Sequence, residues 1–219
     1  MTLSYAGRLD RSAFVAAAAL VHELVSRPEV AASWTHESSC AGMTVGGLTR
    51  HLVGQSTYAV SLLRADPTHP SDVPVLTLLG HYAAAPWINE DLDGDSNRFV
   101  REKSGAQAAE GPDVAVGLQA AAVADLPAVL ADPPAATFLP WQGCRLPTDD
   151  FLVTRLMEMV VHSDDLAVSV GIPAPAFGEA VLEPVLGLLS ALAVVRHGQD
   201  AVVRTLTRPQ RAPGSISAF

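Results

Sequence analysis

Residues 148–170 read TDDFLVTRLMEMVVHSDDLAVSV, and they carry the signals of both ends of one long helix. The helix is expected to start at Thr148, and the two aspartates after it place negative charge in the first turn, where the helix dipole favours it. Gly171 follows the stretch and Pro173 comes two residues later, a pattern typical of a helix end. We therefore predict a helix over residues 148–170, and the neighbouring segments are interpreted from it outward.

Five further segments are predicted to be helical from the spacing of their apolar residues and from the residues at their ends. They cover residues 9–26, 45–65, 75–103, 112–130 and about 176–197. Pro28 ends the first segment, Thr44 is the expected N-cap of the second, which stops before Asp66-Pro67, and Gly198 caps the last. Pro86 should kink or divide the third segment, since proline removes a helical hydrogen bond.

The remaining segments are shorter or less regular. Residues 136–146 contain Trp141-Gln142-Gly143 and form either an extended hairpin or an ordered loop. Most connections are short, which favours antiparallel helices packed side by side. We therefore expect an all-α bundle over residues 1–198, followed by a basic tail at 199–219 whose structure the sequence does not assign.

The composition supports a soluble helical protein. Of 219 residues, 49% are hydrophobic and only 5% are aromatic, a mixture that suits packed helices better than a β-sandwich. The formal net charge of −9 argues against nucleic acid as a main partner, because phosphate binding needs a basic face. We see no secretory signal, the apolar run over residues 14–20 is too short to span a membrane, and two cysteines form no disulfide framework. A cytoplasmic protein is expected.

Glu158 and His162 are the first candidates for chemistry. Residues four apart on a helix lie one above the other, so both side chains can reach the same point. His51 falls on the predicted inward face of its own helix, among Leu48, Leu52 and Gln55. A carboxylate and two imidazoles are ligands that zinc accepts, and three protein ligands leave one position open, as in catalytic sites.

The spacing alone also allows a simpler interpretation. A Glu–His pair at this spacing is often a weak salt bridge on a helix surface. A single histidine among leucines is usually a core residue with a hydrogen bond. On spacing alone, both the metal site and these structural roles stay open.

Two longer segments carry a family resemblance. Met43-Thr-Val-Gly-Gly-Leu-Thr-Arg-His51-Leu and Arg155-Leu-Met-Glu158-Met-Val-Val-His162-Ser-Asp-Asp165-Leu-Ala resemble the DinB/YfiT-like superfamily. Within it, they are similar to the mycothiol-dependent maleylpyruvate isomerase branch, in its N-terminal metal-binding domain. The resemblance covers most of the chain and implies a DinB-like up-and-down four-helix bundle with additional helices. It also implies a divalent metal, zinc or another ion such as Ni²⁺, held by His51, Glu158 and His162.

The resemblance also bears on activity. Glutamate at position 158 points to the mycothiol branch, because many relatives elsewhere in the superfamily use three histidines. It implies mycothiol as the thiol cosubstrate. The characterised isomerases have a second, C-terminal domain, whereas this sequence ends at Phe219, so we expect the basic tail or a partner subunit of a homodimer to take its place.

Several other residues are secondary candidates. Gln55 and Arg155 could line the open side of the metal, and Asp165 could orient His162 as a hydrogen-bond acceptor. Arg204 and Arg208 could contact a carboxylate of the thiol or of an acidic substrate. Ordinary helix polarity, a buried helix contact and a solvated tail are the alternatives for these groups. Cys40 and Cys144 have no cysteine or histidine at zinc-ligand spacing and are expected to lie outside the site as non-ligands. The histidines at 22, 36, 69, 81 and 197 lack a partner at ligand spacing and are expected to be solvated or structural.

Three functions remain open. The first is a metal-dependent enzyme that activates a low-molecular-weight thiol for S-transfer to an electrophilic small molecule, or for its cis–trans isomerisation. The second is a metal-dependent hydrolase, in which the metal activates water and Asp164 or Asp165 would serve as the base. The third is a non-catalytic helical protein that binds a small molecule.

Overall fold

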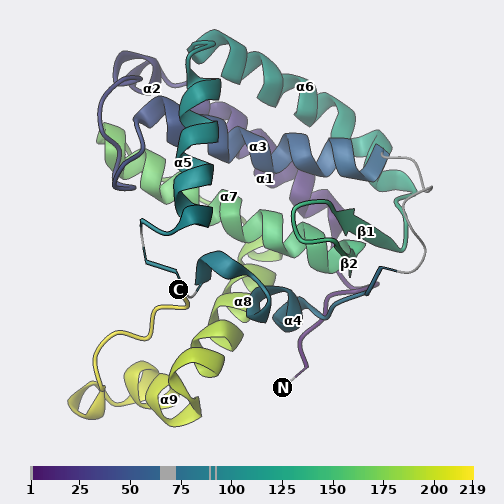
Figure 1. The fold of residues 1–219 in the computed structure, drawn as a ribbon, viewed down its shortest axis with the longest axis vertical. Coiled ribbons are helices and arrows are strands. Elements are labelled where there is room, and N and C mark those ends of the chain that lie inside the picture. The colour runs from purple at the N-terminus through teal and green to yellow at the C-terminus, as the bar shows by residue number, and fades with distance from the viewer. Residues whose placement is uncertain (1, 65–72, 89, 92) are drawn as a thin grey trace.

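The computed structural model describes residues 2–64, 73–88, 90–91 and 93–219, and it consists mainly of α-helices (Figure 1). Four helices form a central bundle: α1 (Arg11–Val25), α3 (Val45–Arg64), α6 (Pro112–Ala131) and α7 (Thr148–Val170). Both α6 and α7 pack against both α1 and α3, so the four enclose one apolar core. This arrangement confirms the all-α bundle.

The helix α7 has the bounds that the sequence predicts. Gly171 takes a left-handed conformation with φ of 72°, which allows the chain to leave the helix sharply. The two aspartates of the first turn also fasten the N-terminal segment to the bundle. Asp149 pairs with the Arg11 guanidinium at 2.8 Å, and the Asp150 carboxylate accepts a hydrogen bond from the backbone N–H of Tyr5.

The N-terminus of α3 is built as the sequence predicts, with one close approach that only the structure shows. The Thr44 hydroxyl accepts a hydrogen bond from the backbone N–H of Gly47 at 3.0 Å, which confirms Thr44 as a capping residue. Gly46 lies against the ring of Trp34, where a Cβ atom would come within 2.6 Å of a ring carbon. Glycine at this position therefore lets the loop before α3 pack directly on the helix.

The helical segment predicted over residues 75–103, which Pro86 is expected to kink or divide, is divided. It consists of α4 (Leu78–Ala83), the 3₁₀ turn η1 (Pro86–Ile88) and α5 (Asp95–Ala108), which crosses the bundle in Figure 1. Pro86 begins the 3₁₀ turn, so here the proline divides the helix and does not merely kink it. Similarly, Pro28 ends α1 but also starts a short helix, α2 (Pro28–Ala32). The predicted stop at Asp66-Pro67 lies outside the described residues.

A small hairpin precedes α7. The strands β1 (Ala136–Leu139) and β2 (Cys144–Pro147) pair antiparallel, with Thr137 opposite Leu146 and Leu139 opposite Cys144. Gly143 in the connecting turn has a φ of 61°, which favours glycine. Of the two structures that the sequence allows here, the extended hairpin is therefore found.

The C-terminal part continues as α8 (Glu179–His197), α9 (Gln199–Thr207) and the 3₁₀ turn η2 (Pro209–Arg211), so the tail that the sequence leaves unassigned contains a helix. After η2 the chain returns to the bundle, where Phe219 packs beside the core. By length and mean hydropathy, α6 and α8 could each cross a membrane, with values of 1.8 and 1.5. This is weak evidence, because core helices of globular proteins have the same character, and α6 packs against α1 and α3.

Candidate metal centre

Two helices of the bundle bring the three proposed ligands together. His51 lies on α3, beside the fully buried Leu48 and Leu52, and α3 packs directly against α7. Glu158 and His162 lie one turn apart on α7, as the spacing predicts. All three side chains are half-buried, with 15–23% of each exposed.

The ligand atoms converge on one point. The Nε2 atoms of His51 and His162 each lie 3.2 Å from the same carboxylate oxygen of Glu158, and the two imidazole rings meet edge to face at 4.8 Å. Bonds of about 2.1 Å to a tetrahedral zinc ion would place neighbouring ligand atoms about 3.4 Å apart. The observed separations are close to that value, so this donor set fits a divalent cation such as zinc.

Hydrogen bonds and opposite charges hold the three side chains together. Burial by itself raises the pKa of Glu158, but hydrogen bonds with His162 and His51 hold it well below its ordinary value. Burial by itself lowers the pKa of His162, yet hydrogen bonds with Asp165, Cys40 and Glu158 raise it well above the ordinary value. The pKa of His51 is lowered, mainly by burial. A proton on His162 therefore balances the Glu158 carboxylate, and a metal ion would displace that proton.

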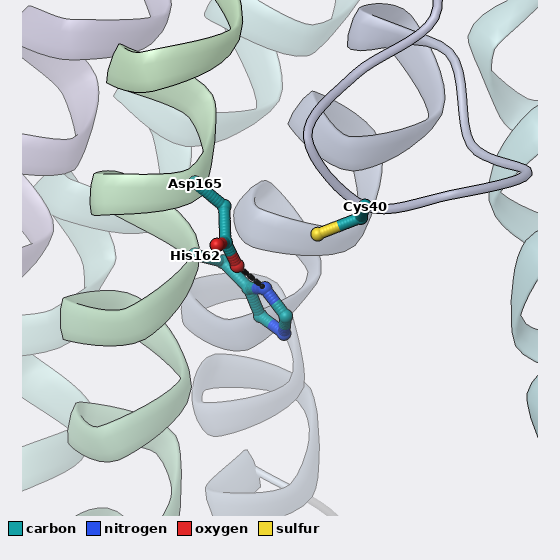
Figure 2. A group of neighbouring side chains, drawn as sticks. All are labelled: Cys40, His162 and Asp165. Atoms are coloured by element: carbon teal, nitrogen blue, oxygen red, sulfur yellow. Dashed lines mark hydrogen bonds and ion pairs between the residues drawn. The ribbon is translucent and has the colours of Figure 1, made fainter. Parts of the chain in front are cut away.

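Asp165 lies where an orienting residue is expected. Its carboxylate accepts a hydrogen bond from Nδ1 of His162 at 2.9 Å, as Figure 2 shows. Because Nδ1 carries the proton in this bond, Nε2 is left to face Glu158 and His51. The same bond lowers the pKa of Asp165.

The expectation that Cys40 lies apart from the site is wrong. Its thiol lies beside His162 and Asp165 (Figure 2), and the possible ligand atoms of these three residues are within 4.8 Å of one another. The loop that carries Cys40 is tied to α7 through Ser39, whose backbone N–H donates to the Ser169 hydroxyl at 2.8 Å. No spacing rule connects Cys40 with a histidine more than a hundred residues later, so the sequence offers no signal for this contact. Cys144 is buried in β2, and burial raises its pKa.

Gln55 and Arg155 lie together next to the ligands. The Gln55 amide donates to the backbone carbonyl of His51 at 2.8 Å, and its nitrogen lies 3.4 Å from Nε2 of the same residue. Arg155 donates from Nη1 to the Gln55 carbonyl oxygen at 2.6 Å. Both residues thus lie next to the ligands, but neither lines the larger pocket beside them, and Arg155 faces a separate small cavity that Glu158 also lines.

A pocket of about 520 Å³ opens beside the ligands and contains all three on its wall. Most of the other lining residues are apolar, including Ala41, Met43, Trp87, Val100, Met157 and Phe219. Phe219 reaches the pocket because the chain folds back, and its ring lies 5.0 Å from that of Trp87.

The predicted role of the basic tail is not supported by its position. Arg204 is exposed and pairs with Asp200 at 2.9 Å on α9, and Arg208 is exposed just beyond that helix. Neither arginine lines the pocket, so the contribution of the tail is the ring of Phe219.

The other histidines follow the expectation with one exception. His36 is exposed, His22 and His197 are half-buried, and His69 lies outside the described residues. His81 is buried in α4, and burial lowers its pKa to about 4. It lines the small cavity together with Tyr82, a residue that the sequence analysis does not single out, since neither has a partner at a recognisable spacing.

A comparison with protein families gives one match. The sequence model described as the mycothiol maleylpyruvate isomerase N-terminal domain matches residues 14–167, which include the three candidate ligands and more than half of the chain. Searches of the curated proteins and of the solved structures found no match.

Proposed function

Since the chain belongs to the family of the mycothiol maleylpyruvate isomerase N-terminal domain, we propose that it is a divalent-metal-dependent enzyme that activates a low-molecular-weight thiol. The observation that carries the proposal is the convergence of His51, Glu158 and His162 on the wall of a pocket of about 520 Å³. Three protein ligands leave a position for a small molecule. Zinc is the preferred ion and nickel a second candidate, because imidazole suits both.

The residues of the chain have separate tasks in this proposal. A bound divalent cation would favour thiolate over thiol, whose pKa in free cysteine is about 8.5. His51, Glu158 and His162 supply the ligand atoms, and Asp165 holds the His162 ring in orientation through Nδ1. The apolar walls of the pocket, with Met157 among them, limit the access of water to the reacting sulfur.

We propose mycothiol as the thiol and an electrophilic small molecule as the second substrate. In cis–trans isomerisation, the thiolate sulfur bonds to an alkene carbon conjugated to a carbonyl, and the resulting single bond rotates. Loss of the same sulfur then restores the double bond and releases the thiolate. In S-transfer, the sulfur–carbon bond is kept and the leaving group departs with its electron pair. Both reactions need the same thiolate, so the bound electrophile decides between them.

A hydrolase is less well supported by the same geometry. Asp165, one of the two bases that the sequence offers, is engaged with His162, and its pKa is lowered by that hydrogen bond. Asp164, the other, is exposed and does not line the pocket. A non-catalytic role would need no open coordination position next to a pocket.

We also propose that the protein acts in the cytoplasm on small molecules, without nucleic acid or membrane as partners. Two copies could pair through apolar side chains that α8 and α9 expose, among them Leu186, Val195 and Leu206. Sedimentation velocity at several concentrations measures whether such a homodimer forms.

The thiol proposal is tested with cobalt in place of zinc. Addition of mycothiol should produce a sulfur-to-metal charge-transfer band, because a thiolate is a softer ligand than the water it replaces. The band should be absent in His51→Ala, which lacks one ligand, and present in Cys144→Ser, which leaves the site unchanged. If no small thiol changes the spectrum of the cobalt protein, the proposed thiol chemistry is refuted, whereas the proposed metal site is not.

A further inference from the structure

A second, smaller cavity lies on the other side of Glu158. Its volume is about 80 Å³, and it shares Glu158 and Trp87 with the large pocket. The rest of its wall includes His81, Tyr82, Gln142 and Arg155. Since one water molecule occupies about 30 Å³ in the liquid, the cavity accepts a group of two or three heavy atoms, such as a carboxylate.

Arg155 is the cation of this cavity, and its contacts are with neutral groups. Its Nη1 donates to the Gln55 carbonyl oxygen, and its Nε donates to the Thr154 hydroxyl at 3.1 Å. The guanidinium carbon also lies 5.8 Å and 6.0 Å from the ring centres of Phe151 and Trp141. Among the described residues, no carboxylate lies within ion-pair distance of Arg155. The guanidinium is thus held by neutral groups, and the carboxylate that acts on it, Glu158 across the cavity, lies beyond ion-pair distance.

Three polar atoms of the neutral residues on the wall are buried without a partner among the described residues, although the Gln142 amide nitrogen donates to the His81 backbone carbonyl at 2.9 Å. Tyr82 is 2% exposed and His81 is 6% exposed. Within the part of the chain that the structure describes, no hydrogen-bond partner is found for the Tyr82 hydroxyl, Nδ1 of His81 or the Gln142 side-chain oxygen. Polar atoms buried in this way are normally satisfied by protein, water or a ligand.

The charge state of these groups suits an anionic ligand. Burial raises the pKa of Tyr82, so the phenol keeps its proton and can donate it in a hydrogen bond. Burial and the nearby Arg155 charge keep His81 neutral. Glu158 is the one group of the wall that would repel an anion, and its carboxylate already lies 3.2 Å from both His51 and His162.

We propose that this cavity is a subsite for the carboxylate of a small organic acid, with the Arg155 guanidinium and the Tyr82 hydroxyl as its donors. Because the cavity adjoins Glu158, an acid held here extends past the metal ligands toward the large pocket. The assignment of this acid as the electrophile, or as an acidic thiol, rests on the proposed function. The binding of a carboxylate does not.

The experiment is a titration of metal-free protein with sodium acetate, against sodium chloride at constant ionic strength. Removing the metal excludes carboxylate binding to the ion itself. Trp87 and Trp141 line the cavity, so their fluorescence reports occupancy. Acetamide, which has nearly the same shape but no charge, is the matched ligand control. Acetate should bind and acetamide should not.

Three variants locate the effect. Arg155→Met should raise the dissociation constant for acetate by about 10–100-fold, and Tyr82→Phe by about 2–10-fold, as expected for a charged and a neutral hydrogen bond. Arg64→Met, at an exposed arginine that pairs with Asp125, is the matched control and should change it by less than about twofold. If Arg155→Met loses its helical circular dichroism, Arg155→Lys and Tyr82→Phe carry the test.

The outcomes are distinct. Equal binding of acetate and acetamide, unchanged binding in Arg155→Met, or no binding of acetate at all would overturn the subsite. Crotonate and N-acetylcysteine, used as competitors of acetate, separate an unsaturated acid from a thiol acid as the source of the carboxylate. Acetate binding by a protein with no thiol chemistry would support the subsite and refute the proposed function.

Discussion

The two sides of Glu158 differ in how charge is balanced. On the side of the large pocket, the carboxylate meets two imidazoles, and a third group, Asp165, supports one of them. On the side of the small cavity, Arg155 has neutral contacts alone among the described residues. The first side offers ligand atoms to a cation, and the second offers the positive charge of Arg155, on which Glu158 acts from across the cavity. The two proposed sites would therefore share one carboxylate and prefer ions of opposite charge.

The two sides of Glu158 also differ in the elements that build them. The metal side is made by two helices that face each other, with residues one turn apart on α7. The cavity side needs α4 and the hairpin, which bring in Tyr82 and Gln142. Substitutions at and around His51, Glu158 and His162 should therefore change metal affinity. The change should be largest for the proposed ligands and smaller for residues that only contact a ligand.

The largest effect is expected from the ligands themselves. His162→Ala should lower metal affinity by more than about 100-fold, beyond the range known for orienting residues, and purified protein should lose most of its one divalent ion per chain. Glu158→Gln should follow, because it removes a negative charge next to the cation. Elemental analysis measures the metal and circular dichroism checks the helices. A parent protein that holds no metal and is as stable as His162→Ala would refute the site.

A smaller loss is expected at Asp165. Asp165→Asn keeps a hydrogen-bond acceptor for His162 but removes the charge, so metal affinity should fall by about 10–100-fold. A competition titration with a coloured chelator compares this variant with Glu158→Gln. Equal effects, or a larger effect in Asp165→Asn, would mean that the ligand and the orienting residue have been exchanged.

The sequence predicts the metal side better than the cavity side, for physical reasons. The bounds of α7 follow from Thr148 and Gly171, and the helical period places Glu158 over His162. The approach of His51 needs only that α3 and α7 are neighbours in the bundle, although 107 residues separate it from Glu158. By contrast, Tyr82 and Cys40 reach the site through tertiary packing of short segments, for which no local pattern exists.

A local signal also predicts the break in the segment over 75–103, because Pro86 divides it as one of the two expected outcomes. The prediction for the basic tail, in contrast, depends on tertiary packing. Arg204 and Arg208 are basic, but charge alone does not show where a tail packs. In this segment Phe219 lines the pocket, because burial of an aromatic ring is favourable, whereas both arginine side chains stay exposed to solvent.

The pH dependence of stability sharpens the contrast between metal-free and metal-loaded protein. Because the pKa of His162 is higher in the folded protein than its value of 6.5 in the unfolded chain, this histidine stabilises the metal-free fold fully below pH 6.5. The contribution is lost as the pH rises through the pKa of His162 in the folded protein. The lowered pKa of Glu158 stabilises the fold above 4.5, and this is lost as the pH falls through the folded value. Metal-free protein should therefore lose this stability as the pH rises through the folded pKa of His162.

Metal-loaded protein should behave in the opposite way at neutral pH. Metal binding releases the His162 proton, so the stabilisation by a fixed concentration of free metal increases with pH. Urea unfolding at several pH values, with and without chelator, measures both slopes. In the metal-free state, Asp165→Asn should reduce the loss, because it removes a cause of the raised pKa. Parallel slopes with and without metal would contradict the proposed exchange of proton for metal.

The smallest effect on metal affinity is expected at Cys40, although this thiol lies on the wall of the pocket. It contacts His162 and Asp165 on the side of the ring away from Glu158, and it is half-buried, whereas Cys144 is 2% exposed in β2. Cys40→Ser should therefore change metal affinity by less than about 10-fold, as expected for a weak hydrogen bond.

In the folded protein, a neutral maleimide should modify Cys40 more than about 100-fold faster than Cys144, which reacts only when the fold opens. Mass spectrometry of peptides over time gives both rates, and Cys144→Ser should leave the fast phase unchanged. Bound mycothiol should slow the modification of Cys40, since both occupy the same pocket, and a rate that mycothiol leaves unchanged would place the thiol elsewhere.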